Sequence, residues 1–509
     1  MNAKHRPCMK TKLFLMLGAL FCAQLVPAQE SWREGRNVAG VAQGDETGHT
    51  AQAGLFGKYT SGGFRAPSMG KSLITAGVAA QSESRFKNLY LTGNFGFELV
   101  HGSQMMGSMF AEPGYYPVDL LEFTPGTKVR QTYDIGGGLA WKNDSRWTPG
   151  ATARFRGVNY AKRKDLRHTT YRQEIEVAPS VLYRGDSWKA GVSLVFEKTS
   201  EQIRAEQVGA DPVEPYMAFL DKGIRYGVIQ VWDGSGIHLK ESGVDGFPVK
   251  EYTWGAAVQG EWGDFLYADL EMVWSRGQVG EKGYTWFQFP GQKISAKVIG
   301  IVPSASGAHV LRADFSWFAQ DNYEVVVDKV TQGGVTTPVT YGNNRIFQRR
   351  TLEASTAWEF THRKDWSLGA EILVTRGRDR CSIMYPFLDN DESTEMLISV
   401  QGRVRLGAFD LAAALMGGSI IGTRGHVVDN ADPSLGVSSV PYRLQEWWDK
   451  EQEVTDAPRL GLTLALRYNL PIKVPLYIEA GCNWVHAFGV KLLPGCDRQT
   501  SYLTLGYSF

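Results

Sequence analysis

Charged side chains recur at every second position within several apolar segments of this 509-residue chain. Such side chains line the aqueous interior of pores, where they hydrate and select solutes. Both signs are present and acids outnumber bases, so we expect a wetted pore with a mixed, mildly cation-favouring field. The alternative is a network of cross-strand ion pairs that fills the interior. The lumen-lining candidates are Arg130, Asp134, Arg154, Arg156, Glu174, Glu176, Glu261, Asp269, Glu271, Arg312, Asp314, Glu353, Glu359, Glu371, Arg403 and Arg405.

Catalytic chemistry would need a nucleophile or a paired acid and base. Five histidines fall near one end of the strands predicted below or in the connections at that end, and none stands in a His-x-Ser or paired Asp–His setting. They are His101, His168, His238, His426 and His486. The sequence contains no phosphate loop, zinc signature or nucleophile elbow. We therefore expect no enzyme, no cofactor and no metal site. A formal net charge of +1 gives no reason to expect a nucleic-acid partner.

The composition excludes two classes of protein. No stretch after residue 28 has the 18 apolar residues of a membrane-spanning helix, which argues against a helical membrane protein. Aromatic residues make up 12% of the chain, which argues against a disordered chain. The 57 glycines and the charged fraction of only 21% favour a large β protein.

Apolar and polar residues alternate with a period of two along many segments. Successive side chains of a strand point to opposite faces, so each such segment predicts a strand with one apolar face. The clearest examples are residues 89–99, 129–141, 188–196, 352–360 and 460–468.

The connections between these segments alternate in length. Short turns fall at about 143–146, 184–187, 263–264, 303–307, 362–365, 407–408 and 470–474. Long connections fall at about 103–127, 161–170, 201–249, 277–292, 321–349, 378–394, 422–458 and 486–498. A transmembrane barrel with periplasmic turns at one end and extracellular loops at the other has this alternation of short and long connections. Aromatic residues flank the short turns, as in Trp141 with Trp147 and Phe360 with Trp366, which is typical of an interfacial girdle.

Counting strands gives the fold class. Seventeen segments between residues 72 and 509 alternate in this way, and residues 53–60 supply one more. We therefore predict an all-β, transmembrane antiparallel β-barrel of about 18 strands, with 16 as the alternative.

The N-terminus reads as a targeting segment followed by a short tail. Lys4, Arg6, Lys10 and Lys12 precede the apolar run of residues 13–26, and Ala28 suits a cleavage site. We expect residues 1–28 to be a cleaved secretory signal peptide and residues 29–52 a periplasmic N-terminal tail or small insert, too short for a plug domain. The barrel is expected over residues 53–509.

The last strand ends on an aromatic residue. Leu503, Leu505, Tyr507 and Phe509 alternate with polar or small residues. This pattern resembles the C-terminal assembly signal of Gram-negative outer-membrane proteins. That resemblance implies the outer membrane as location, and outer-membrane lipid and the barrel-assembly machinery as partners.

Three cysteines remain after the predicted cleavage. Cys482 could pair with Cys496, Cys381 could pair with Cys496, or all three could be thiols.

Two loops are apolar enough to fold on themselves. Residues 201–249 contain Tyr216, Met217, Phe219, Leu220, Tyr226, Val228, Ile229, Val231 and Trp232, which favours a gate or cap over a binding epitope. Residues 442–452 predict a short surface helix, whose Trp447 and Trp448 either pack under the loop or stack on a sugar.

The whole mature chain resembles outer-membrane β-barrel proteins of Bacteroidota, in particular a barrel family known only as a domain of unknown function. The matching stretches are residues 36–40 (RNVAG), residues 57–71 (GKYTSGGFRAPSMGK) and the terminal LTLGYSF. The resemblance implies no substrate and no catalytic residue.

Our leading hypothesis is a porin-like channel or uptake component for small solutes, acting alone or with a surface lipoprotein or transporter. The alternatives are a surface adhesion or complex-scaffolding barrel with a filled lumen, and a hydrolase at the rim.

Removal of Phe509 is expected to impair membrane assembly, because the terminal aromatic residue completes the assembly signal. The measurement is the fraction of chain that migrates as a folded, heat-modifiable barrel in outer-membrane preparations. Normal insertion of the truncated chain would contradict the assignment of that signal.

Overall fold

The structure is a computed structural model. It describes residues 31–43, 48–142, 145–164, 166–206, 217–223, 226–231, 246–281, 284–362, 365–382, 388–423 and 442–508. The predicted signal peptide, Phe509, His238, His426, Tyr216 and Trp232 lie outside the described residues.

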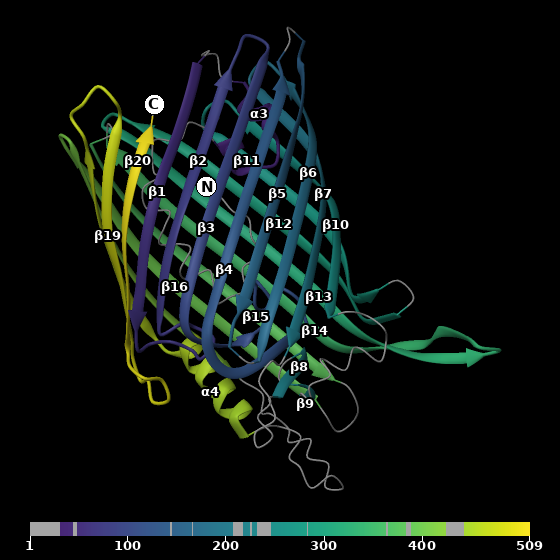
Figure 1. The fold of residues 1–509 in the computed structure, drawn as a ribbon. Coiled ribbons are helices and arrows are strands. Elements are labelled where there is room, and N and C mark those ends of the chain that lie inside the picture. The colour runs from purple at the N-terminus through teal and green to yellow at the C-terminus, as the bar shows by residue number, and fades with distance from the viewer. Residues whose placement is uncertain are drawn as a thin grey trace.

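Strands dominate the described part of the chain (Figure 1). Before the first long gap they are β1 (Gly48–Gly62), β2 (Ser72–Arg85), β3 (Leu89–Ser108), β4 (Asp119–Trp141), β5 (Trp147–Lys162), β6 (Arg167–Arg184), β7 (Trp188–Glu206), β8 (Met217–Gly223) and β9 (Tyr226–Val231). After it they are β10 (Phe247–Trp262), β11 (Leu266–Glu281), β12 (Tyr284–Ser304), β13 (Gly307–Gln332), β14 (Val335–His362), β15 (Trp366–Ser382), β16 (Leu388–Leu406), β17 (Phe409–Thr423), β18 (Arg459–Asn469), β19 (Leu476–Ala487) and β20 (Asp497–Ser508).

The strands close into a barrel. Neighbours in sequence pair antiparallel, β7 pairs with β10, and β1 pairs with β20. Of the 20 strands in the described part of the chain, β8 and β9 form a side hairpin on β4, so 18 make up the wall. The predicted fold class and strand count are therefore confirmed.

The outside of the wall is apolar. Leu139, Ile135 and Phe95 are 51%, 48% and 41% exposed, and they belong to a large set of exposed aliphatic and aromatic side chains. Cross-strand partners such as Ile135 and Phe95 share the same face. Such an apolar surface suits hydrocarbon rather than water.

Aromatic rings gather at the short turns, as predicted. Tyr183 lies between Trp147 and Trp188, with ring centroids 4.8 and 5.4 Å apart. Phe360 and Trp366 flank another turn at 5.3 Å. In Figure 1 these turns are at the top.

One long loop is a hairpin instead. Residues 321–349 are expected as a connection, but β13 and β14 continue to pair until Gln332 and Val335. The turn between them is Gly333–Gly334, with φ of 60° and 82°, the positive values that a tight two-residue hairpin turn requires. The hairpin projects far beyond the barrel rim (Figure 1).

In the described residues, three helical elements stand at the two ends of the barrel. The 3₁₀ turn η2 (Trp32–Glu34) and helix α3 (Val38–Val41) lie near the short turns, and α4 (Tyr442–Asp456) lies at the opposite end. No helix in the described residues is long and apolar enough to cross a membrane.

The described cysteines, Cys381, Cys482 and Cys496, form no disulfide with one another. Buried Cys381 donates a hydrogen bond from Sγ to the carbonyl of Ile346 at 3.2 Å. Of the alternatives left by the sequence, three thiols is therefore the one in the structure.

Candidate functional site

The alternation of the strands places the charged candidates on the inner face of the barrel. Asp134 and Arg156 are cross-strand partners, whereas their neighbours Ile135 and Phe155 point outward. The same register puts the whole set opposite the exposed apolar residues: Arg130, Asp134, Arg154, Arg156, Glu174, Glu176, Glu261, Asp269, Glu271, Arg312, Asp314, Glu353, Glu359, Glu371, Arg403 and Arg405. Their role in conducting a solute stays a prediction.

Some of these side chains pair across the wall itself. Arg154 Nε donates to Asp134 Oδ1 at 3.0 Å. Arg405 Nε donates to Asp410 Oδ1 at 2.9 Å, and Arg403 lies 3.3 Å from the same carboxylate. This part of the interior fits the ion-pair alternative. Several other candidates contact two inserted segments instead.

The first inserted segment is residues 31–43, which the sequence assigns to a periplasmic tail or small insert. Its side chains contact strands from β2 round to β13. Trp32 is fully buried, and its ring meets Tyr267 edge-on at 5.4 Å between centroids. Residues 31–43 therefore form a small insert inside the barrel at the short-turn end, which we call the N-terminal insert.

The Arg-Asn-Val-Ala-Gly stretch gives this insert its shape. Asn37 caps α3, and its side chain accepts a hydrogen bond from the Ala39 amide at 3.0 Å. Gly40 lies against the indole of Trp32, where a Cβ would stand 2.1 Å from ring carbons. Gly191 in the wall makes room for Asn37, since a Cβ there would stand 2.2 Å from the Asn37 amide nitrogen. Small residues on both sides thus allow the close fit.

Ion pairs hold the insert to the wall. Arg36 forms salt bridges with Glu176 and, at 2.8 Å, with Glu271. Glu34 bridges Lys297 and Arg312, the latter at 2.6 Å. The indole of Trp32 donates to Glu261. Four predicted lumen candidates are therefore occupied by the insert: Glu176, Glu261, Glu271 and Arg312.

The electrostatics of these pairs stabilise the charged forms. Burial alone would raise the pKa of Glu34, but Lys297 and Arg312 outweigh it and hold the pKa below the usual value. Burial alone would lower the pKa of Arg36, but Glu271 and Glu176 outweigh it and raise the pKa. The ion pairs therefore keep Glu34 and Arg36 of the insert charged, opposite charged residues of the wall.

The second inserted segment is residues 109–118, between β3 and β4, which we call the inward loop. Glu112 pairs with Arg156 on β5 at 2.6 Å, and the carbonyl of Gly114 accepts from Arg349 on β14 at 3.0 Å. Tyr115 donates its hydroxyl to Glu251 on β10 at 3.0 Å. Partners on strands so far apart around the wall require the loop to cross the lumen.

Apolar packing fixes the inward loop. Its buried side chains join wall residues near the long-loop end in one cluster, made of Met109, Phe110, Tyr115, Tyr116, Val118, Leu120, Leu166, Ile203, Ala218, Leu220, Phe247, Val249, Val279, Phe287, Phe289, Ile346, Phe347 and Cys381. Arg172 stacks over Tyr115 at 4.0 Å and binds Glu201 at 3.2 Å. The sequence pattern predicts only a long connection over residues 103–127. The signal for the inward loop is its unusual share of aromatic residues for a connection.

A cap covers this end of the barrel. Strand β8 pairs with β4, and Phe219 packs edge-on against Trp448 at 5.6 Å. Trp447 meets Phe123 at 6.2 Å, and both tryptophans are at most 9% exposed. The structure therefore favours core packing of this pair over sugar stacking. In the apolar patch of residues 201–249, Phe219 and Leu220 are buried, as a cap requires. The side chains of Met217, Tyr226, Val228, Ile229 and Val231 lie outside the described residues.

A buried charge cluster lies beneath the cap. Glu122 stands between Lys128 at 3.0 Å and Lys162 at 2.5 Å, and all three side chains are fully buried. The sequence pattern does not predict this cluster, because Glu122 falls within residues 103–127, which are expected to be a connection.

One histidine has an acidic partner that the sequence hides. His486 Nδ1 on β19 lies 2.8 Å from Asp497 Oδ1 on β20 at the exposed rim, and the two residues are 11 positions apart in sequence. Trp484 and Phe488 flank the imidazole. His168 is buried, and His101 lies on β3. No group of three or more potential metal ligands occurs in the described part of the chain. The absence of enzymatic activity stays a prediction.

Comparisons with known proteins identify the family. No curated protein matches the sequence. An apoprotein form of the FrpB iron transporter of Neisseria meningitidis is similar at 9% identity and a TM-score of 0.44, covering 95% of this chain and 83% of that one. A ferric enterobactin receptor of Pseudomonas aeruginosa is similar at 10% identity and a TM-score of 0.42, covering 91% and 81%. Residues 38–509 match a family of unknown function, DUF6850, and the chain belongs to that family.

Proposed function

We propose that this chain is an outer-membrane uptake component for small solutes whose lumen is closed at both ends in the resting state. The observation that carries the proposal is the N-terminal insert, a charged segment seated inside a closed barrel. A barrel that only anchors a surface structure has no need for an insert matched to its inner wall by several ion pairs.

The polar contacts of the insert suit a movable closure. When the insert leaves, water can solvate Glu176, Glu271, Arg312 and Lys297, whose partners in the structure are Arg36 and Glu34. Ion pairs that are exposed to water contribute little free energy. Hydration of the separated charges therefore offsets much of what the pairs contributed. The same side chains would then form the wall of a hydrated path with both signs of charge.

The insert lies at the end from which a periplasmic partner would act. Tyr267 and Ile299, which share its apolar cluster, stand near the short turns on β11 and β12. Short turns face the periplasm in bacterial barrels. A periplasmic protein that binds the segment before β1 could therefore withdraw the insert, and the inward loop and cap would gate the opposite mouth.

The outer membrane is the proposed location. The closed wall and its apolar exterior satisfy the two demands of a hydrocarbon environment, paired backbone groups and lipid-compatible side chains. Export by a cleaved signal peptide and insertion by the barrel-assembly machinery belong to the same proposal.

A second candidate is a surface scaffold with a permanently filled lumen. It is favoured by the β13–β14 hairpin, which projects beyond the rim (Figure 1) and exposes Val335 and Tyr341 at 64% each. The first test below separates the two candidates.

Replacing Arg36 with Ala should loosen the insert, because Glu176 and Glu271 are then left without their shared partner inside the barrel. In planar bilayers we expect the frequency of open events to rise about tenfold, and further when the inward loop is shortened in the same chain. Arg33→Ala is the matched control, because Arg33 pairs with Glu83 at a more exposed position. If both closures are removed and no ionic current appears, the scaffold candidate is correct and the uptake proposal fails.

Acid should open the N-terminal closure. The pKa of Glu34 is lower in the folded state than its ordinary value of 4.5, so its pairs contribute stability above that pH and lose it as pH falls through the lowered pKa. We expect conductance to appear only at a pH below the ordinary pKa of a glutamate, which is 4.5. Glu34→Gln should raise conductance at neutral pH and remove the acid step that belongs to this carboxyl. An unchanged acid profile in Glu34→Gln would show that Glu34 does not hold the closure.

A further inference from the structure

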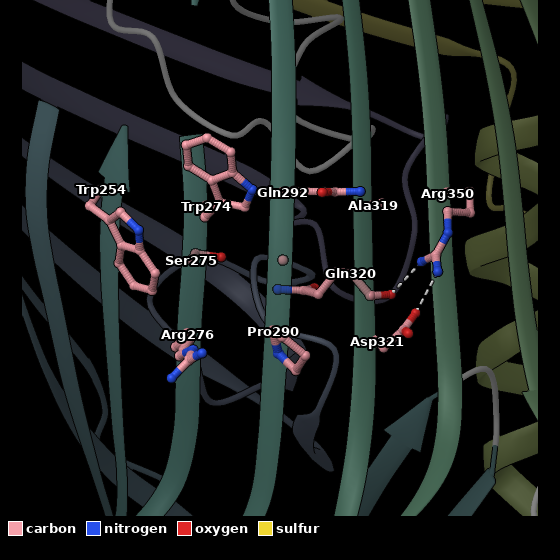
Figure 2. Close-up of a pocket in the computed structure, with 11 residues that line it drawn as sticks. Trp254, Trp274, Ser275, Arg276, Pro290, Gln292, Ala319, Gln320, Asp321 and Arg350 are labelled. Atoms are coloured by element: carbon pink, nitrogen blue, oxygen red, sulfur yellow. Dashed lines mark hydrogen bonds and ion pairs between the residues drawn. The ribbon is translucent and has the colours of Figure 1, made fainter. Parts of the chain in front are cut away.

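The outer wall carries a depression of about 300 Å³ that the uptake proposal does not use. It lies over strands β10 to β14, and Figure 2 shows the side chains around it. The lining residues that matter for its chemistry are Trp254, Trp274, Arg276, Gln292, Asp321 and Arg350.

The strand register places this depression on the outside of the barrel. Trp254 and Trp274 are direct cross-strand partners and are 38% and 39% exposed, whereas Ser275 between the outward positions is buried. Continuing across the wall, Trp274 pairs with Gln292, Gln292 with Ala319, and Ala319 with Arg350. The small side chain of Ala319 leaves the hollow between the two indoles and the guanidinium.

The depression stands at the border between apolar and charged surface. One outward position nearer the short turns, the wall is apolar: Met272 pairs with Ile294, Ile294 with Trp317, and Trp317 with Leu352. One position nearer the long loops, Arg276 pairs with Pro290. Next to Arg350, strand β15 adds three exposed, outward arginines: Arg376, Arg378 and Arg380. Such a border is where the head group of a membrane lipid lies.

The cations at the depression are held in place. Arg350 binds Asp321 at 2.7 Å and donates to the Gln320 carbonyl at 3.1 Å (Figure 2). The guanidinium of Arg276 lies 5.9 Å from the ring centroid of Trp254. Two arginines against one aspartate give the lining a net positive charge. Guanidinium forks of this kind match phosphate oxygens.

We propose that this depression binds the head group of a phosphorylated glycolipid of the surrounding leaflet. Phosphate groups would lie at Arg276 and at Arg350, on opposite sides of the depression, and the sugar would rest on the indoles of Trp254 and Trp274. The acyl chains would follow the apolar row of Met272, Ile294 and Leu352 toward the short turns. Since the long-loop end of such barrels faces outward, the leaflet concerned is the outer one.

The test measures lipid binding to the purified, detergent-solubilised full chain by native mass spectrometry. Lipid A is the probe for a phosphorylated glycolipid, and phosphatidylglycerol is the probe for a phosphate without a sugar ring. We expect the double variant Arg276→Gln with Arg350→Gln to bind lipid A at least about tenfold more weakly than the wild type. Arg146→Gln is the matched control, because Arg146 is an exposed arginine, 59% accessible, beside a short turn at the opposite rim.

A second variant separates the two lipid classes. Trp254→Leu with Trp274→Leu removes the indole faces but keeps both arginines, so lipid A binding should fall while phosphatidylglycerol binding stays the same. Heat-modifiable migration establishes that each variant is a folded barrel before binding is compared. Equal lipid A binding by the wild type and the double arginine variant would overturn the site. Equal binding of the two lipids by the wild type would overturn its assignment to a glycolipid.

Discussion

The pairing of β1 with β20 is the interaction on which the rest of the molecule depends. Eleven residues of β1, from Gln52 to Gly62, meet the last strand in antiparallel register. In hydrocarbon every backbone N–H and C=O needs a partner within the protein, and an open sheet edge would leave a row of them unpaired. Closure removes that edge. It also divides the side chains of every strand into an inner and an outer set, and the two sets then meet different physical demands.

The outward side chains face lipid, whereas the inward side chains surround enclosed charged groups. Outward residues need only be apolar over the middle of the wall and aromatic or basic at its borders, which explains why the depression at Trp254 and Arg350 lies at such a border. Inward residues are constrained by what fills the barrel. At the short-turn end the filling is a single folded segment, so the wall there alternates small residues such as Gly191 with charged partners such as Glu176. The outer face thus suits a membrane, and the inner face suits the segments that fill the barrel.

The sequence predicts the wall well because the wall is built from local rules. A period of two, short turns and aromatic residues beside them are visible within a dozen residues, and they lead to eighteen strands without any knowledge of pairing. The insert is different. Trp32 and Arg36 are recognisable only by partners more than 200 residues away, Glu261 and Glu271. The same holds for His486 and Asp497, which antiparallel pairing brings together. The β13–β14 hairpin was missed for another reason: its outer part is exposed on both faces, so no buried face imposes an apolar pattern.

The two closures differ in what would open them. The inward loop is joined to the wall at both ends, through β3 and β4, and its aromatic residues share a large apolar cluster with the wall. Moving it would expose apolar surface to water, with nothing to compensate unless a ligand supplies replacement contacts. The N-terminal insert also buries an apolar cluster, a smaller one around Trp32, but it adds ion pairs whose charges water can solvate once they separate. Under the proposed uptake function, a mechanical or electrostatic signal from the periplasm suits the insert, and a solute at the outer mouth suits the inward loop. In that proposal, the two closures let a solute enter from outside before the barrel opens to the periplasm.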